Sequence, residues 1–106
     1  MDLEGPWCWS KMAQADVVSV AKRLANLESM TWQDILGKRD HGVPLDDLST
    51  EAQRRLTALS RDDLDELLSL HVNGLKRVWG IRHGDVVRLL WWDPNHDVCP
   101  SPKKHT

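Results

Sequence analysis

The chain contains no phenylalanine and no tyrosine, so all six of its aromatic residues are tryptophan. Tryptophan is large and carries one N–H donor that needs a partner when it is buried. We therefore expect most of these residues in the core. Because side chains alternate along a strand, the adjacent Trp91 and Trp92 must face opposite sides. One of the two then meets solvent, a partner or a covering helix.

Long apolar runs and cysteines are also scarce. No stretch approaches the ~20 apolar residues of a membrane-spanning helix, and the first residues lack the basic and apolar segments of a signal peptide. Cys8 and Cys99 are too few for a disulfide framework. We expect a reduced, cytoplasmic protein without a membrane partner, and a single Cys8–Cys99 bridge is the less favoured alternative.

The chain has no strong charge of one sign, because 14 Lys and Arg oppose 16 Asp and Glu for a net charge of -2. Six bases and three acids follow residue 70, whereas eight bases and thirteen acids precede it. This split permits a basic face on an acidic body. It is weaker than the basic balance of a typical nucleic-acid binder, so a DNA-binding regulator is the third-ranked interpretation.

Familiar cofactor motifs are missing as well. The sequence has no Gly-rich phosphate loop, no Ser-centred nucleophile elbow and no dinucleotide fingerprint. We therefore predict no cofactor.

The first two thirds of the chain have helical periodicity. Apolar residues recur at three- and four-residue spacing from about residue 14 to 29, which predicts a helix. A cap-like start predicts a short helix over 31–37. A third helix is predicted over about 48–59, with Asp46 or Asp47 as its N-cap.

The periodicity then shortens to two, which is typical of strands. The predicted strands cover 68–72, 76–82 and 86–92. Asn73-Gly74 between the first two predicts a type I′ hairpin turn, with positive φ at both central positions. The third strand is the most apolar, so we expect it in the centre of the sheet, and residues 96–99 predict a short fourth strand.

These elements predict one α+β domain, in which two or three N-terminal helices pack on a C-terminal antiparallel meander of three to four strands. Its parts are an irregular arm (1–12), a helical part (13–65), the meander (66–100) and a tail (101–106). The polar residues 38–43 predict a loop inside the helical part. We expect the helices to cover one face of the sheet, because both need a partner for their apolar sides.

Charged side chains gather around the end of the third predicted strand. RNA cleavage needs groups for proton transfer, for which histidine is suited near neutral pH, and cations for the phosphate, for which the arginine fork is suited. The candidate catalytic residues are His96 and Asp93. The candidate RNA-binding residues are Arg77, Arg82, Arg88 and Lys104. The alternative is a solvated face of arginines, with Asp93 capping the turn.

Residues of the second and third predicted strands and of the following turn also suit two other functions, metal binding and partner binding. Asp93, His96 and Cys99 have donor types that zinc accepts, but their spacing matches no paired-ligand motif, so no metal site is predicted. Tryptophan and arginine dominate binding hot spots. Trp79, Trp91 and Trp92 are therefore candidate partner-binding residues.

The segment from Leu89 to Ser101, which reads LLWWDPNHDVCPS, resembles the ending of a group of small uncharacterised bacterial proteins. Met30-Thr31-Trp32 and the final Lys104-His105-Thr106 fit that group too. The resemblance covers most of the chain and implies no established activity.

The order of helices, arginine-bearing meander and strand ending near a histidine is more distantly similar to RelE/ParE-type toxins. That superfamily includes ribosome-dependent messenger RNA endoribonucleases and gyrase inhibitors, each held inactive by an antitoxin. The resemblance implies that Arg77, Arg82 and Arg88 bind RNA and that His96 assists cleavage. The chain departs from the pattern in lacking a clear first strand, in being acidic, and in having no tyrosine after the histidine.

The leading hypothesis is therefore a RelE-like toxin that acts on RNA or on the translation machinery, as a possible endoribonuclease with an antitoxin partner. The alternative is a non-catalytic interaction module or inhibitor of phage or plasmid type, which binds a protein partner through exposed Trp and Arg residues.

Overall fold

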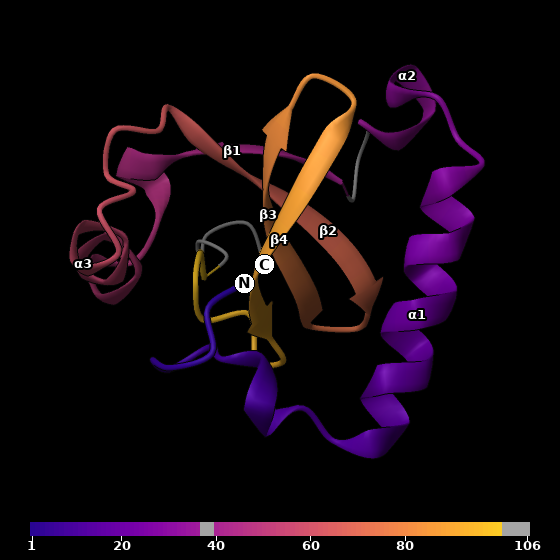
Figure 1. Ribbon diagram of the computed structural model, residues 1–106, viewed down its shortest axis with the longest axis horizontal. Coiled ribbons are helices and arrows are strands. Elements are labelled where there is room, and N and C mark those ends of the chain that lie inside the picture. Colours follow the sequence, from indigo (N-terminus) through magenta and orange to yellow (C-terminus); the bar gives the residue numbers. More distant parts are fainter. Residues whose placement is uncertain (37–39, 101–106) are drawn as a thin grey trace.

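The computed structural model describes residues 1–36 and 40–100, which form an α+β fold around one antiparallel sheet (Figure 1). The helices are α1 (Gln14–Glu28), α2 (Trp32–Ile35) and α3 (Thr50–Ala58). The strands are β1 (His41–Pro44), β2 (Glu66–Asn73), β3 (Lys76–His83) and β4 (Val86–Asp93). The predicted α+β class and the antiparallel meander are confirmed.

The caps of the two shorter helices explain where these helices begin. Thr31 and Asp34 form a capping box at α2, in which each side chain accepts the other's backbone N–H. At α3 the Ser49 hydroxyl accepts a backbone N–H of the first turn. The predicted cap at Asp46 or Asp47 is wrong, because both residues lie in a preceding 3₁₀ turn.

The sheet has the order β1-β2-β3-β4. Its fourth strand is β1, which pairs antiparallel with β2 in a segment that we had predicted as a loop. Residues 96–99 form no strand and instead follow the turn after β4. That prediction failed because Asp93 holds this segment through its side chain, so the backbone needs no strand partner.

Strand β4 lies at the edge of the sheet, so the prediction of a central position is wrong. Its apolar character has another cause, since the N-terminal arm covers the last part of its outer edge. The backbone N–H of Asp2 donates to the oxygen of Leu90 at 2.9 Å, and the N–H of Trp92 donates to the oxygen of Trp7 at 3.0 Å. The arm thus closes one half of an otherwise open strand edge.

The hairpin between β2 and β3 differs from the prediction in its turn. Asn73 pairs with Lys76, so the central residues are Gly74 and Leu75. Of these two only Gly74 has a positive φ, of 51°. This rules out the predicted type I′ turn and fits a turn in which the first central residue alone has a positive φ.

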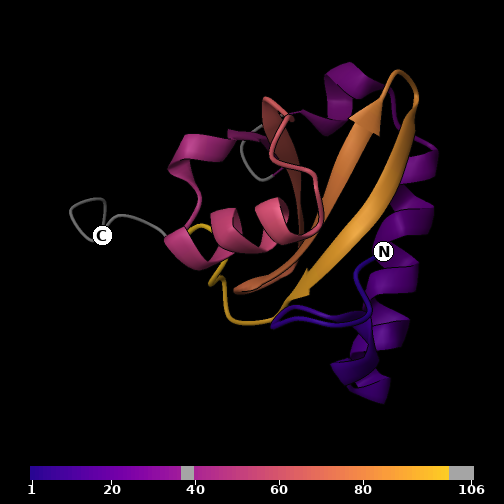
Figure 2. The same ribbon diagram turned by 60° about the vertical axis from the view of Figure 1, so that its left-hand side comes forward.

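Both faces of the sheet are covered by helices, and not one face as predicted. Helix α1 lies on one side and α3 on the other (Figure 2). The core is therefore divided into two layers, one between the sheet and α3 and one between the sheet and α1. The physical reason is alternation, because β2, β3 and β4 carry apolar residues on both faces.

Candidate functional site

The structure places Asp93 in the interior, where it is fully buried. One carboxylate oxygen accepts the Trp79 indole N–H and the backbone N–H of Val98, both at 3.1 Å. The other oxygen accepts the backbone N–H of Asp97 at 2.9 Å. These bonds hold the turn after β4 against the sheet. The predicted catalytic role is therefore corrected to a structural one, because a buried carboxylate with both oxygens engaged has no access to a substrate.

His96 lies in this turn and is half-buried. Its φ of 61° is a left-handed conformation that a non-glycine residue seldom adopts. No hydrogen bond of the described residues joins its side chain to Asp93 or to an arginine.

The predicted RNA-binding arginines do not share a surface. Strand register pairs Arg88 with Ile81, which belongs to the α3-side core, and Arg82 with Val87, which packs on the α1-side core. Arg82 and Arg88 therefore lie on opposite faces of the sheet. Arg77 lies at the other end of β3, where it donates to the backbone oxygens of Gly74 and Lys76. Lys104 lies outside the described residues.

The three tryptophans that were predicted to bind a partner are all in the core. Trp79, Trp91 and Trp92 are no more than 2% exposed. Alternation along β4 sends Trp91 to the α3 side and Trp92 to the α1 side, and a helix covers each. The partner-binding prediction is therefore wrong for these residues, because covering both faces of the sheet leaves neither tryptophan exposed.

On the α3 side, the indole N–H groups of Trp79 and Trp91 are each matched to an aspartate. Trp91 donates to Asp2 at 2.9 Å, as Trp79 does to Asp93. Asp2 also receives two hydrogen bonds from Arg55. The Arg55 hydrogen bonds lower the pKa of Asp2 to about 2. Asp2 and Asp93 are therefore both engaged in hydrogen bonds that hold this layer together.

The zinc alternative finds no support at the turn after β4. Asp93 is fully engaged, and the Cys99 thiol contacts the backbone oxygen of Asp47 at 3.3 Å. Burial raises the pKa of Cys99, which disfavours the thiolate that a metal needs. Within residues 1–36 and 40–100 no group of His, Cys, Asp and Glu side chains is placed to hold a metal ion. Cys8 and Cys99 are not bridged.

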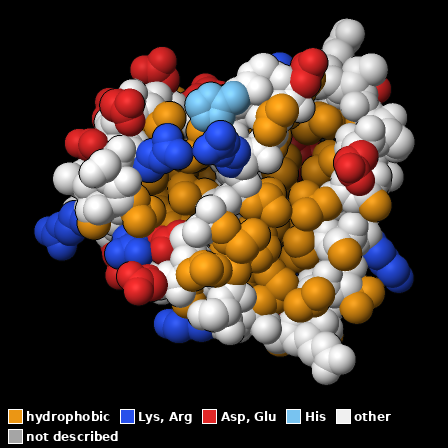
Figure 3. Space-filling view, viewed as in Figure 1, with side chains coloured by type: hydrophobic (Ala, Val, Ile, Leu, Met, Phe, Trp, Pro, Cys, Tyr) orange, Lys and Arg blue, Asp and Glu red, His pale blue; other side chains and the backbone are white. Residues whose placement is uncertain are grey.

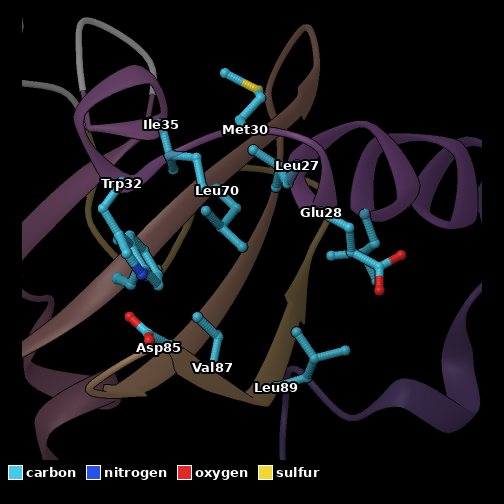
Figure 4. A pocket seen from close by; sticks show the side chains of 11 residues that line it. Leu27, Glu28, Met30, Trp32, Ile35, Leu70, Asp85, Val87 and Leu89 are labelled. Atoms are coloured by element: carbon cyan, nitrogen blue, oxygen red, sulfur yellow. The ribbon is translucent and has the colours of Figure 1, made fainter.

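A groove of about 620 Å³ lies between α1, α2 and the sheet, and we call it the α1-side groove. Figure 3 shows hydrophobic side chains gathered in this hollow. The lining consists of nine apolar side chains and two carboxylates: Leu24, Leu27, Glu28, Met30, Trp32, Ile35, Leu68, Leu70, Asp85, Val87 and Leu89. Glu28 and Asp85 lie on opposite sides of the groove (Figure 4).

The wall of the groove at α2 is built around Trp32. The capping box fixes the start of α2, and the Arg82 guanidinium lies 3.7 Å from the centroid of the Trp32 ring. Arg82 also donates to the backbone oxygen of Gly84 at 2.9 Å. This hydrogen bond and the contact with the Trp32 ring together fix the position of the guanidinium. Trp32 is one of the two tryptophans that stay partly exposed.

The floor of the groove depends on Gly80 of β3. A Cβ at this position would lie 2.6 Å from Val87 Cγ1 and 3.0 Å from the backbone oxygen of Arg88. The missing side chain lets Val87 lean across β3. Glycine inside a strand often marks such a close approach, and this is the sequence signal that points to the groove.

A smaller pocket of about 200 Å³ lies on the α3 side of β4, and we call it the arginine pocket. Arg61, from the loop after α3, and Arg88, from β4, both line it. Among the described residues neither guanidinium has an ion pair or a hydrogen bond. Figure 3 shows basic side chains next to each other on this side of the sheet. No local sequence pattern connects Arg61 with Arg88, because they lie 27 positions apart.

Comparisons with protein-family models, with curated proteins and with solved structures find no match for this chain. None of the helices in the described part of the chain has the length and apolar character needed to cross a membrane.

Proposed function

We propose that this protein is a protein-binding module whose α1-side groove receives an apolar segment of a partner protein. The observation that carries the proposal is the groove itself, with nine apolar side chains around about 620 Å³ of open space. Contiguous apolar surface of this kind typically marks an interaction site, because its exposure to water is unfavourable unless a partner covers it.

The composition of the groove supports a protein partner. Trp32 supplies a partly exposed aromatic anchor, and Met30 supplies an adaptable side chain beside it. The carboxylates of Glu28 and Asp85 stand at the margin, where polar groups commonly surround the apolar centre of an interface.

Photo-crosslinking in cells that produce the protein tests the proposal. A photoreactive amino acid replaces Met30 in the groove or, as the matched control, the exposed Val18 of α1 outside it. We expect a discrete crosslinked protein from position 30 only. Adding Leu24→Glu, which places a charge in the groove, should abolish that product, whereas adding Val18→Glu should preserve it.

Two results would contradict the groove proposal. One is equal crosslinking from positions 18 and 30, which would indicate non-specific contact. The other is a position-30 product that survives Leu24→Glu in a folded variant, with folding checked by circular dichroism.

A RelE-like toxin that acts on RNA is the second candidate. The observation that favours it is the arginine pocket, because two unpaired guanidiniums on one surface suit a phosphate group. His96 is half-buried and remains the candidate for proton transfer. In this second proposal, Arg88 and Arg61 bind the RNA phosphate, whereas the sequence predicted this role for Arg77, Arg82 and Arg88.

Controlled expression in a bacterial host tests the second candidate. We expect arrest of growth and translation by the wild type, with relief by Arg88→Ala and by His96→Ala. Arg54→Ala, at an exposed arginine of α3 outside the pocket, is the matched control and should remain toxic. Normal growth with the wild type, or full toxicity of both pocket and histidine variants, would rule this candidate out.

A further inference from the structure

The outer edge of β4 is only half covered. His83 and Val86 flank the two-residue turn between β3 and β4 and are register partners, so they form a hydrogen-bonded pair. Such pairs alternate with positions whose N–H and C=O groups point away from the neighbouring strand, which here are Val87 and Leu89. The backbone hydrogen bonds between the arm and the edge lie farther along, at Leu90 and Trp92.

The backbone groups of Val87 and Leu89 therefore have no strand partner among the described residues. An uncovered strand edge is a template for another strand, and proteins usually block it with charge, proline or a covering segment. Here the arm blocks the edge from Leu90 onward and leaves about four residues open, which is about 13 Å of strand.

The open edge separates two sites of opposite chemistry. Val87 and Leu89 line the α1-side groove on one face, and Arg88 lines the arginine pocket with Arg61 on the other. Leu89 borders both sites, because the edge runs between them. A strand laid beside β4 would send alternate side chains into the groove and toward the arginines.

We propose that the partner binds as an extended segment that adds a strand to the β4 edge at Val87 and Leu89. Its apolar side chains enter the α1-side groove, and the carboxylates that alternate with them face Arg61 and Arg88. This inference rests on the proposed function, since it specifies how the partner of the groove binds. Strand addition combines main-chain hydrogen bonds for affinity with pockets for alternate side chains, which give selectivity.

Charge distinguishes this partner from a second copy of the same chain. Two β4 edges paired antiparallel across Val87 and Leu89 would place the two Arg88 side chains directly opposite each other. Like charges at opposed positions destabilise a strand pair. Acidic residues at these positions of the partner are instead matched to two guanidiniums that have no partner of their own among the described residues.

Nuclear magnetic resonance titration with a blocked synthetic peptide, Gly-Val-Glu-Val-Glu-Val-Gly, tests the inference. We expect saturable shifts along β4 and at least tenfold slower hydrogen exchange at the amides of Val87 and Leu89. Arg88→Glu should weaken binding about tenfold, whereas Arg54→Glu, an exposed charge reversal outside the pocket, should leave binding unchanged. A peptide with N-methyl groups on the edge-facing amides should not bind.

Several outcomes would overturn strand addition. Shifts confined to groove side chains, with unchanged exchange at Val87 and Leu89 and equal binding of the N-methyl peptide, would leave the groove proposal intact and remove this one. Absence of peptide binding at millimolar concentration would also remove it, and the crosslinking from position 30 would then decide the groove proposal separately.

Two further measurements distinguish the acidic peptide from two other possible ligands, which are a second copy of the chain at the same edge and a nucleic acid at the arginine pocket. Concentration-dependent dimerisation that protects Val87 and Leu89 without peptide would assign the edge to a second copy. Shifts at Arg61 and Arg88 caused by a short single-stranded RNA, with none caused by the peptide, would assign the pocket to nucleic acid. Either result contradicts an acidic peptide partner.

Discussion

The two faces of the sheet share strands β2, β3 and β4, but they are covered to different extents. On the α3 side, Trp79, Trp91 and Leu56 are no more than 1% exposed, and the indole N–H groups of Trp79 and Trp91 each donate to an aspartate. On the α1 side, half-buried Leu89 and Trp32 surround an open groove of about 620 Å³. The closed face thus supplies stability, and the open face has apolar surface that is not used for folding.

The cause of this difference lies in β4. The register shifts between Trp79 and Gly80, where a bulge lets Leu90 and Trp91 both reach the α3-side core. The bulge adds no residue to the α1 side, and Gly80, the β3 residue paired with Leu89 there, has no side chain to fill the space. One face is therefore filled while the other remains hollow.

The largest expected loss of stability is on the closed face. Asp93→Ala removes a buried acceptor and leaves the Trp79 indole and two backbone N–H groups without a partner. We expect the free energy of unfolding to fall by about 4 kcal/mol. Urea denaturation followed by tryptophan fluorescence measures it. A loss below about 1 kcal/mol would mean that this network does not hold the closed face.

Substitution of two adjacent leucines allows the stability contributions of the two faces to be compared directly. Leu90 is 6% exposed in the α3-side core, whereas Leu89 is half-buried at the groove. We expect Leu90→Ala to cost about 2.5 kcal/mol, because it leaves a cavity, and Leu89→Ala to cost less than about 1 kcal/mol. Equal losses in parallel denaturation experiments would show that the groove is packed in solution.

The Asp2–Arg55 pair makes the stability contributed by the closed face depend on pH. Because the folded pKa of Asp2 is lowered to about 2, the pair contributes its full stability above pH 4 and loses it as the pH falls toward 2. We expect Asp2→Asn to cost about 2 kcal/mol at pH 7 and progressively less below pH 4. Denaturation of both proteins from pH 7 to pH 2.5 checks this, and a pH-independent difference would contradict it.

Much of the secondary structure could be predicted from the sequence. The three helices and the three strands of the meander follow periodicity and turn signals that are local, so Gln14–Glu28 and Val86–Asp93 lie close to their predicted bounds. Trp7 and Trp9 hold the N-terminal arm against the sheet. Trp7 contacts Trp91 with ring centroids 5.0 Å apart, and Trp9 donates its indole N–H to Leu90.

The rest depends on register and on contacts between distant residues. Strand β1 is stabilised where it begins by Asp40, which accepts the backbone N–H of His71 at 2.8 Å and pairs with Arg23. No local pattern predicts this arrangement. The faces of Arg82 and Arg88 likewise depend on a hairpin register, so the sequence suggested one arginine surface where the structure has two.

The smallest expected effect on stability concerns the open face. Arg82→Ala removes the guanidinium 3.7 Å from the centroid of the Trp32 ring and one hydrogen bond to Gly84 at an exposed turn. We expect a loss of about 0.5 kcal/mol in the free energy of unfolding, because exposed cation–π pairs contribute little. Partner binding should weaken several-fold, since Trp32 then loses the contact that orients it along the groove wall. Arg54→Ala, at an exposed site on the other side of the sheet, is the control for both measurements. A large loss of stability with unchanged crosslinking from position 30 would reverse the assignment, because the open face would then serve folding and not binding.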